Sequence, residues 1–574
     1  MAHSDSSDSA YSDSEFSSDS VSSDGQSVHS DSVSSDSAYA TSVYSDSACS
    51  ESISSVPPQI PEPPKKPPIL DEFIQFGYFY IPFMFCQQLM VLVLTSAFFF
   101  PTFGSRLPTI SKCGDENFES IRLTDRCKHL EKLRASGSNC TPEFDNDFWS
   151  LPQELNYYCG TAYIVKEASI IQKIGHFVGA FIAGQLSDMF GRKKTLIVGI
   201  VGMLGSFIGV SFATDLVWYS VAMFFIALFS SYLITVDTVY LVEMVPPKHV
   251  TWSLSFIGFA PNVIVFAGLA WISHDFRTLA RVCAGITTAL LVMQIWCPES
   301  ARWLLYKHNV EEAKNVVRRI HRWNRTLTDN KSVQMDIAFL KNSNEIELQR
   351  ERENEINPNS RKKFYLYHLF ATDTMEKRIL SICLMCTLLY FGYYKLIFNM
   401  QHLPGNVFIN VAIVGALLWL INILYGIADV KYGNIEENKN GTLFIVSFCL
   451  LFCFGVVSIK YYVGLHVIAF DATCYIILGA LSFNVLIIAG VVTSRVFPTP
   501  VRNSAVGLVH FCGRFGMITE LVLFYYIHPD SQETYLEGIM TFFILPFLFM
   551  WAFPLFDVHV PETDEPLSDQ MPDM

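Results

Sequence analysis

Residues 184–194 contain four charged side chains and directly follow a run of mostly apolar residues. They read GQLSDMFGRKK and follow directly on the apolar run 170–183. Charged groups are costly within a bilayer, so an acid and three bases in a glycine-bearing turn belong at its surface. We expect Asp188, Gly191 and Arg192 to form part of an ionic clamp there, between two membrane helices.

Two ionisable residues lie within long apolar runs, where such residues point to a polar pathway. Arg514 is about half-way along residues 504–526, and Asp237 lies within residues 216–239. Because a guanidinium keeps its charge, Arg514 needs an anionic substrate, a polar environment or an internal ion pair. Glu520 is six residues away, a poor spacing for one helix face, so Asp237 is the better internal partner. Asp237 can instead bind a cationic group, and both residues together would suit a zwitterion.

An aromatic pair and three further basic residues complete the polar candidates. Tyr390 and Tyr394 are four residues apart and therefore share a helix face, where they can hold an aromatic or ammonium group. An aromatic belt at the membrane interface explains them equally well. We expect His176 and His510 to be packed groups, and Lys173 to extend its amine towards the membrane surface.

No residue pattern typical of an enzyme is found. The sequence contains no Gly-Lys dipeptide, which excludes a phosphate-binding P-loop and gives no sign of an ATP-driven pump. No His and Cys residues cluster at the spacing of metal ligands. We therefore expect no catalytic residues, no metal, no cofactor and no nucleic-acid partner.

The composition is typical of membrane proteins. Of the 574 residues, 51% are hydrophobic and 16% are charged, and the mean hydropathy is +0.31. Repeated apolar runs of about twenty residues are each long enough to cross a bilayer. They predict an all-α membrane protein with twelve transmembrane helices. The predicted spans are residues 78–100, 168–187, 195–213, 216–239, 251–272, 279–296, 379–398, 407–428, 443–459, 472–493, 504–526 and 536–556.

The predicted spans form two six-helix halves. The N-terminal half covers residues 71–300, a charged loop covers residues 301–377, and the C-terminal half covers residues 378–556. Basic residues cluster at 192–194 and 318–325, on one side of the predicted membrane. By the positive-inside rule this side is cytoplasmic, and with an even number of spans both termini are cytoplasmic too.

The loop 101–167 then lies outside the cell. It carries four cysteines, Cys113, Cys127, Cys140 and Cys159, and a glycosylation sequon at Asn139. An even number of cysteines in an exterior loop predicts two disulfides, whose pairing the sequence leaves open. A glycan is expected on Asn139. The sequon at Asn324 falls on the cytoplasmic side and is expected to be a chance match.

The formal charge of −14 resides in the two tails. Residues 1–70 form a Ser- and Asp-rich cytoplasmic tail with no Lys or Arg before Lys65. It has too few large apolar groups to fold, so we expect it to be disordered. Serines followed by acids suit an acid-directed kinase, and a solvated tail without a partner is an equal alternative. Residues 557–574 form a second acidic tail.

The segment GQLSDMFGRKK resembles the signature loop between the second and third helices of the major facilitator superfamily. Four further stretches resemble the organic ion transporters, the solute carriers that move organic cations, anions and carnitine. These stretches are DFR at 275–277, PESARWLL at 298–305, FPTPVRN at 497–503 and VPET at 560–563. The resemblance covers residues 71–569.

This resemblance implies a plasma-membrane transporter that works by alternating access. The substrate would bind between the first, fourth, seventh and eleventh spans, against Arg514, Tyr390, Tyr394, Asp237 and Glu520. A charge clamp at the cytoplasmic end would hold the outward-open state. By resemblance, its members are Asp188, Gly191, Arg192, Glu243, Glu299 and Arg302.

The resemblance also bears on the substrate. Cation carriers of the family tend to have Asp at the position of Arg514, whereas anion and carnitine carriers tend to have Arg. Arg514 therefore favours a small organic anion or a zwitterion. Asn422 stands where anion carriers often have Lys, which weakens this interpretation and leaves an organic cation as the alternative.

Two departures from the family pattern motivate a different function. Met189 and Met223 stand where the family usually has Arg. Their loss, together with the unusual N-terminal tail, would also fit a non-transporting membrane sensor or scaffold. Uptake of a labelled substrate distinguishes this alternative from a transporter.

Overall fold

The computed structural model describes two stretches of the chain. The first runs from residue 75 to 432, with gaps at 119–120, 122, 137–139, 146–147, 160–161, 308, 327–331, 333–334, 338, 340–365, 371–372 and 400–406. The second consists of residues 490, 493, 497 and 501–522. Both tails and the predicted spans 443–459 and 536–556 lie outside the described residues, as does nearly all of 472–493.

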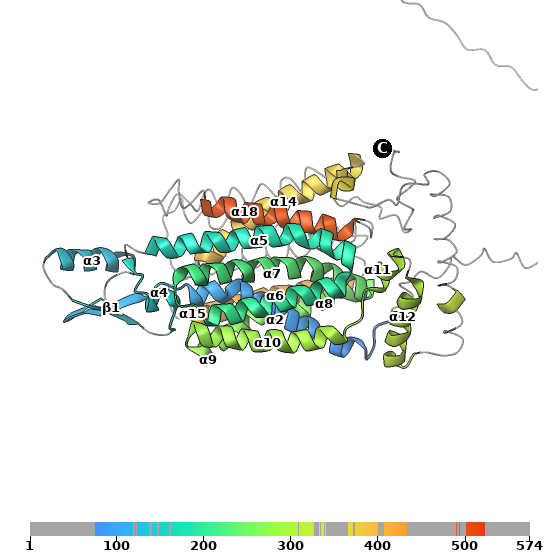
Figure 1. The fold of residues 1–574 in the computed structure, drawn as a ribbon, viewed down its shortest axis with the longest axis horizontal. Coiled ribbons are helices and arrows are strands. Elements are labelled where there is room, and N and C mark those ends of the chain that lie inside the picture. Colours follow the sequence, from blue (N-terminus) through green and yellow to red (C-terminus); the bar gives the residue numbers. More distant parts are fainter. Residues whose placement is uncertain are drawn as a thin grey trace, which may run out of the picture. The chain divides into compact units, whose positions relative to one another are not determined.

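The N-terminal half is built from long helices that lie side by side (Figure 1). They are α2 (Tyr80–Gly104), α5 (Ala162–Phe190), α6 (Arg192–Ser211), α7 (Leu216–Met244), α8 (Pro247–Ile257), α9 (Phe259–Ser273) and α10 (Phe276–Trp296). The predicted span 251–272 is divided at Gly258 into α8 and α9. Pro261 explains the division, because its ring cannot be accommodated against the carbonyl four residues earlier in a continuous helix.

Three long helices of the C-terminal half are described: α14 (Asp373–Asn399), α15 (Val407–Tyr432) and α18 (Arg502–Val522). Between the halves lie α11 (Ala301–Tyr306), α12 (Val310–Asn324) and the 3-10 helix η2 (Leu366–Phe370). Within the described residues, six helical stretches are long and apolar enough to cross a membrane. They are Tyr80–Gly104, Arg192–Ser211, Leu216–Met244, Trp252–Ser273, Phe276–Trp296 and Val407–Leu424.

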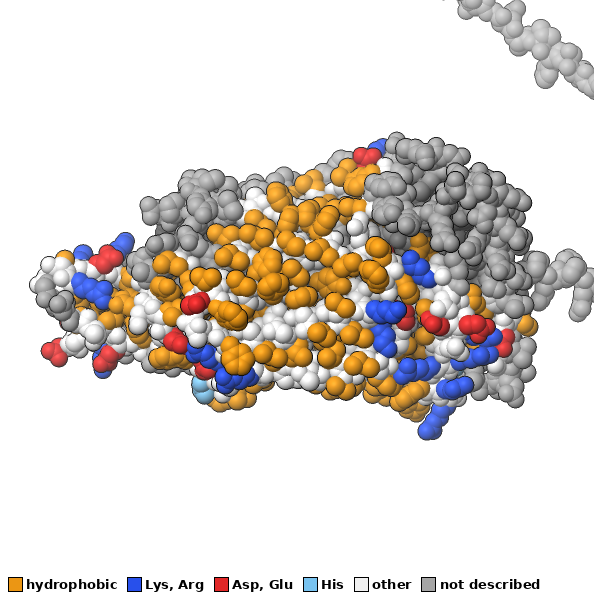
Figure 2. Space-filling view, in the orientation of Figure 1, with side chains coloured by type: hydrophobic (Ala, Val, Ile, Leu, Met, Phe, Trp, Pro, Cys, Tyr) orange, Lys and Arg blue, Asp and Glu red, His pale blue; other side chains and the backbone are white. Residues whose placement is uncertain are grey.

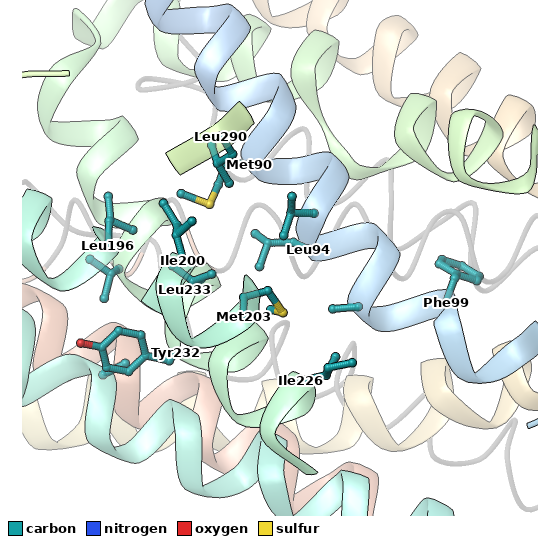
Figure 3. Packing of buried hydrophobic residues seen from close by; sticks show 14 of the residues in the cluster. Met90, Leu94, Phe99, Leu196, Ile200, Met203, Ile226, Tyr232, Leu233 and Leu290 are labelled. Atoms are coloured by element: carbon teal, nitrogen blue, oxygen red, sulfur yellow. The ribbon is translucent and has the colours of Figure 1, made fainter. Parts of the chain in front are cut away.

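Large apolar side chains fill the space between α2, α6, α7 and α10. Figure 3 shows Met90 and Leu94 of α2 close to Ile200 of α6 and Leu290 of α10. Figure 2 shows that hydrophobic side chains also cover a broad band of the outer surface, with charged side chains gathered at its two ends. This distribution matches a protein whose middle section lies in lipid.

Small residues let particular helices approach closely. A Cβ on Gly179 of α5 would overlap the backbone of Leu228 in α7, so a larger residue would push these helices apart. Gly184 of α5 packs in the same way against the backbone of Asn503 in α18. The second contact joins the N-terminal half to the C-terminal half.

The loop 101–167, which the sequence predicts to be exterior, folds into a small disulfide-bonded unit. Its elements are β1 (Thr109–Cys113), β2 (Glu116–Asn117), α3 (Leu123–Ala135), β3 (Pro142–Asp145) and α4 (Leu151–Glu154). The strands form an antiparallel sheet in the order β2-β1-β3. The disulfides are Cys113–Cys140 and Cys127–Cys159, which confirms two bridges and resolves the pairing that the sequence left open. Asn139 lies outside the described residues.

Helix α12 is fixed to the start of α2 by Asn324. The Oδ1 atom of Asn324 accepts a hydrogen bond from the backbone N–H of Phe79 at 2.9 Å, and its Nδ2 donates to the carbonyl of Gln75 at 2.7 Å. Gly77 leaves room for this side chain, because a Cβ there would lie 2.5 Å from Asn324 Cγ. The buried amide is therefore committed to protein contacts.

Candidate functional site

The charge clamp centres on Arg192, whose side chain is fully buried. Its Nε and Nη2 atoms donate to the two carboxylate oxygens of Glu243, each at 3.1 Å. Its Nη1 atom lies 3.1 Å from Asp188 Oδ1. These residues meet because Asp188 lies in the last turn of α5, Arg192 is the first residue of α6 and Glu243 lies in the last turn of α7. A buried guanidinium requires such partners, since an unpaired charge is costly in this environment.

Gly191 permits the sharp turn between α5 and α6. Its φ is +100°, a region that residues with a side chain rarely adopt. A Cβ at this position would also lie 2.6 Å from Glu299 Oε2 and 3.0 Å from the ring of Trp303. Both observations explain why glycine occupies this position.

Glu299 caps the start of α6. Its carboxylate accepts the backbone N–H groups of Arg192 and Lys193 at 2.9 and 3.0 Å, where the helix dipole favours a negative charge. Burial raises the pKa of Glu299, and these backbone hydrogen bonds oppose the rise. Arg302 lies within electrostatic reach of Tyr80, whose hydroxyl donates to the carbonyl of Met244 at 2.9 Å.

The C-terminal half contributes residues to the clamp that the sequence analysis missed. The backbone N–H and the hydroxyl of Ser504 donate to Asp188 Oδ2 at 3.2 and 3.0 Å. Asn503 donates to the hydroxyl of Ser187 at 3.0 Å, and Arg502 Nη1 lies 3.8 Å from Glu243 Oε1. The FPTPVRN segment could have pointed to these residues, because it places polar residues at the start of a predicted span.

At the end of the helices that carries the disulfide-bonded unit, which is predicted to be exterior, the halves meet through aromatic rings. Phe103 at the end of α2 stacks on Phe408 at the start of α15, with ring centroids 5.1 Å apart and planes 18° apart. Phe148 of the exterior unit lies 6.3 Å from Phe408 and 5.7 Å from Phe103. All three side chains are buried. We call these residues the exterior aromatic cluster.

Further along α18, Arg514 and Tyr390 form a buried cation–π pair. The guanidinium Cζ of Arg514 lies 5.0 Å from the ring centroid of Tyr390 in α14. Gly513 leaves space for the ring, and Thr387 of α14 donates to the carbonyl of Cys512 at 3.0 Å. Two of the predicted substrate residues, from the seventh and eleventh spans, are thus brought together.

The face of α5 that packs on α18 carries Lys173. These helices run in opposite directions, because Phe177 contacts Phe511 with a centroid distance of 4.1 Å while Gly184 contacts Asn503. This register places Lys173 at the level of Arg514. The expectation that Lys173 extends to the membrane surface is wrong, since the residue is only 4% exposed. Packing against α18 covers its side chain.

Asp237 lies in a different environment. It is buried in α7, where Gln87 Nε2 of α2 donates to its two carboxylate oxygens at 2.9 and 3.2 Å once the amide is oriented to satisfy both groups. The described contacts of Asp237 are therefore with the first span. The side chains of Tyr394 and Glu520 lie outside the described residues.

Comparisons with known proteins place these features in a family. The model of the Major Facilitator Superfamily matches residues 164–519. Solute carrier family 22 member 16 of Xenopus laevis is 24% identical over 378 residues, covering 64% of this chain and 62% of that protein. Organic cation/carnitine transporter 2 of Mus musculus is 24% identical over 479 residues, covering 80% of this chain and 78% of that protein.

Solved structures give the same fold. The proton:xylose symporter XylE bound to 6-bromo-6-deoxy-D-glucose matches with a TM-score of 0.57 at 14% identity, covering 83% of this chain and 96% of that one. A partially occluded inward-open XylE from E. coli gives a TM-score of 0.52 at 15% identity, covering 83% of this chain and 98% of that one.

The chain belongs to the Major Facilitator Superfamily, and its relatives are solute carriers of the organic ion transporter group. This confirms the family resemblance and the all-α facilitator fold, of which six candidate membrane helices fall within the described residues. The curated relatives named above are transporters, and the chain spans 62% and 78% of their lengths.

Proposed function

We propose that this carrier moves small organic anions or zwitterions across the plasma membrane by alternating access. Arg514 binds the negative group of the substrate. The observation that supports this most directly is the buried Arg514–Tyr390 pair between α18 and α14. Lys173 adds a second cationic group at the same level, on the face of α5 that packs on α18.

The chemistry of this pair suits a carboxylate or sulfate. A guanidinium stays charged at every physiological pH and can donate two parallel hydrogen bonds to one such group. Tyr390 holds the guanidinium in place by a cation–π contact. A zwitterion is the more specific form of this proposal, because Asp237 offers a buried carboxylate on α7 for a cationic group. One relative carries carnitine in its name.

The cytoplasmic clamp acts as the inner gate in this proposal. Asp188, Arg192, Glu243 and Glu299 belong to the N-terminal half, and the segment Arg502–Ser504 closes the gate from the other half. Opening towards the cytoplasm requires that the bonds from Ser504 to Asp188 break. We further propose that both tails are cytoplasmic, while kinase recognition of the N-terminal tail stays a prediction.

The test is uptake of a labelled panel of organic anions, zwitterions and cations into oocytes. Arg514→Asp should lower anion uptake by about ten- to hundredfold, because a hydrogen bond to a charged group contributes about 1.5–3 kcal/mol. Arg514→Lys should retain part of the uptake. Arg322→Asp is the matched control, since Arg322 is an exposed arginine of α12. Unchanged anion uptake by Arg514→Asp would remove Arg514 from the substrate site.

The same panel tests the other functions. Uptake of cations by the unchanged protein would favour the organic cation alternative. Saturable binding without flux would favour a sensor or scaffold. Met189, one of the departures that motivated a sensor, is 61% exposed, and the ion pairs of Arg192 form without it. Its substitution is therefore compatible with a working clamp.

A further inference from the structure

We propose that three basic side chains beside the end of α10 bind the phosphate headgroup of an anionic phospholipid. They are Lys193 and Lys194 at the start of α6 and Arg319 of α12, and we call them the lipid headgroup site. Figure 2 shows that Lys and Arg side chains gather at one end of the apolar surface band. This binding does not depend on which substrate the protein moves, because the contacts that build the site are among α6, α10 and α12.

Two of the cations are held at the last residues of α10. Lys193 Nζ donates to the carbonyl of Ile295 at 2.8 Å, and Arg319 Nη2 donates to the carbonyl of Trp296 at 3.0 Å. Because these carbonyls are neighbours in the chain, the ammonium and the guanidinium lie close together. Both also act electrostatically on the thiol of Cys297, the next residue. The negative end of the helix dipole stabilises positive charge at this position.

Two tryptophan rings place Arg319 at the level of the membrane interface. The guanidinium Cζ lies 4.9 Å from the ring centroid of Trp296, the last residue of a candidate membrane span. Trp323 is exposed and packs edge-on against Trp296, with ring centroids 5.3 Å apart. Indole rings concentrate at the headgroup level of a bilayer. The basic side chains beside them are therefore at the level of lipid phosphates.

The held cations keep hydrogen-bond donors for a ligand. An ammonium has three donors and a guanidinium has five, and the described side-chain contacts use one of each. Lys194 adds an exposed ammonium in the same turn. Among the described carboxylates, Glu299 is directed at the backbone N–H groups of α6, and Glu311 and Glu312 lie in the first turn of α12, about two turns before Arg319. Phosphate oxygens can take the remaining donors as charge-assisted hydrogen bonds.

An apolar surface continues from the cations along both membrane helices. On α6, Val198 and Val201 follow Lys194 at spacings of four and seven residues and so share its face. On α10, Val292 and Ile295 lead up to the site. All four apolar side chains are more than half exposed, and α6 packs on α10. Positive charge above a continuous apolar strip matches a phospholipid, whose acyl chains cover the strip, better than it matches a soluble phosphate.

The charge and the position of the site select an anionic lipid. Basic pockets between membrane helices attract anionic headgroups, which are concentrated in the cytoplasmic leaflet, and this is the end that we propose to be cytoplasmic. The contacts with backbone carbonyls and Trp296 distinguish the site from a solvated basic face. Side chains that are already ordered lose less conformational entropy when a ligand binds.

The experiment titrates the full-length protein in detergent micelles with fluorescent phosphatidylinositol 4,5-bisphosphate and measures anisotropy. The double variant Lys193→Gln with Arg319→Gln should bind about thirtyfold more weakly, or about fivefold for each cation removed. Arg325→Asn is the matched control and should change binding by less than about twofold. Arg325 is an exposed arginine six residues after Arg319, on a different face, and its φ of +55° suits Asn.

Each other result has a defined meaning. If the double variant does not fold, Lys194→Gln replaces it, since this exposed side chain can be changed without loss of a described contact, and it should weaken binding about fivefold. Unchanged binding in the variant tested would overturn the proposal, as would an equal loss in Arg325→Asn. Equally tight binding of phosphatidylcholine would exclude recognition of charge. Equally tight binding of inositol 1,4,5-trisphosphate, which has no acyl chains, would assign the site to a soluble phosphate.

Discussion

The two ends of this protein join its halves by different chemistry. At the end that we propose to be cytoplasmic, the halves meet through charged and hydroxyl groups. Arg192, Glu243 and Asp188 lie on one side, and Arg502 and Ser504 lie on the other. At the exterior end, they meet through the exterior aromatic cluster of Phe103, Phe148 and Phe408. Polar bonds require exact donor and acceptor positions, whereas ring contacts depend mainly on buried area and tolerate small shifts.

This difference bears on how each end opens. Breaking the cytoplasmic contact exposes charged groups that water can solvate, so hydration offsets part of the lost bonding. Separating the exterior rings exposes apolar surface that water does not solvate favourably. We therefore expect substitutions at the cytoplasmic end to be sensitive to charge and those at the exterior end to be sensitive to size.

The largest effect is expected when Arg192 is changed to Ala. This change leaves the Glu243 carboxylate buried beside Asp188 without its main partner, and breaking a buried pair costs about 3–5 kcal/mol. The measurement is the thermal unfolding midpoint of the detergent-solubilised protein by fluorescence size exclusion. The double variant Arg192→Met with Glu243→Leu removes both charges and should be more stable than Arg192→Ala. A double variant that is less stable than the single one would contradict the ionic account of this end.

A smaller effect, governed by size, is expected at Phe408. Phe408→Ala removes the ring that stacks on Phe103 and should weaken the exterior contact by about 1–3 kcal/mol, since burying such a side chain contributes about 1.5–3 kcal/mol. Phe408→Leu keeps most of the apolar volume and should cost less than half as much. The opening of this end is measured by labelling a cysteine introduced at Ala412, one helical turn after Phe408, with a membrane-impermeant maleimide. Equal labelling in the Ala and Leu variants would contradict a contact that depends on buried area.

The smallest effect is expected at an exposed ion pair of the cytoplasmic end. Asp336 lies 2.9 Å from Lys314 and 3.0 Å from Arg318, and its side chain is 39% exposed. The hydrogen bond from Lys314 lowers the pKa of Asp336 below its usual value. Its contribution to stability is therefore present above the pKa of the unfolded chain and is lost as the pH falls through the lowered value.

Lys314→Ala should cost only about 0.2–1 kcal/mol because solvent and salt screen exposed pairs. Hydrogen exchange of α12 at pH 7 and pH 3 measures this change in stability. The difference between the variant and the unchanged protein should shrink at pH 3 and in high salt. If Lys314→Ala lost as much stability as Arg192→Ala, burial would not explain the difference between the exposed ion pair of Asp336 and the buried ion pair of Arg192.

Much of the clamp could be predicted from the sequence because its members lie at helix ends. Asp188, Gly191 and Arg192 lie in one short turn. A charged turn that follows an apolar run is expected at the membrane surface, because charged groups are costly within the bilayer. The contribution of Ser504 was not predicted, since a serine near a helix start has many local roles. The contact between Ser504 and Asp188 spans 316 positions and depends on how the halves pack.

The polar residues within the spans were harder to predict. Arg514 and Tyr390 were singled out from their type and position, but their stacking depends on the packing of α14 on α18 at Gly513. Lys173 was expected at the membrane surface, and the packing of α5 on α18 buries it instead. Asp237 was weighed as a partner of Arg514, whereas its described hydrogen bonds are with Gln87.

The sequence by itself determined the membrane class, the family, the charged turn and the cysteines of the exterior unit. These properties follow from local composition and spacing, because apolar length and charge position decide what a bilayer accepts. The tertiary structure alone decided the pairing of the disulfides, the aromatic contact at the exterior end and the basic residues gathered at the level of Arg514. Each of these joins side chains that are far apart in the chain, and their meeting depends on helix packing that no local pattern specifies.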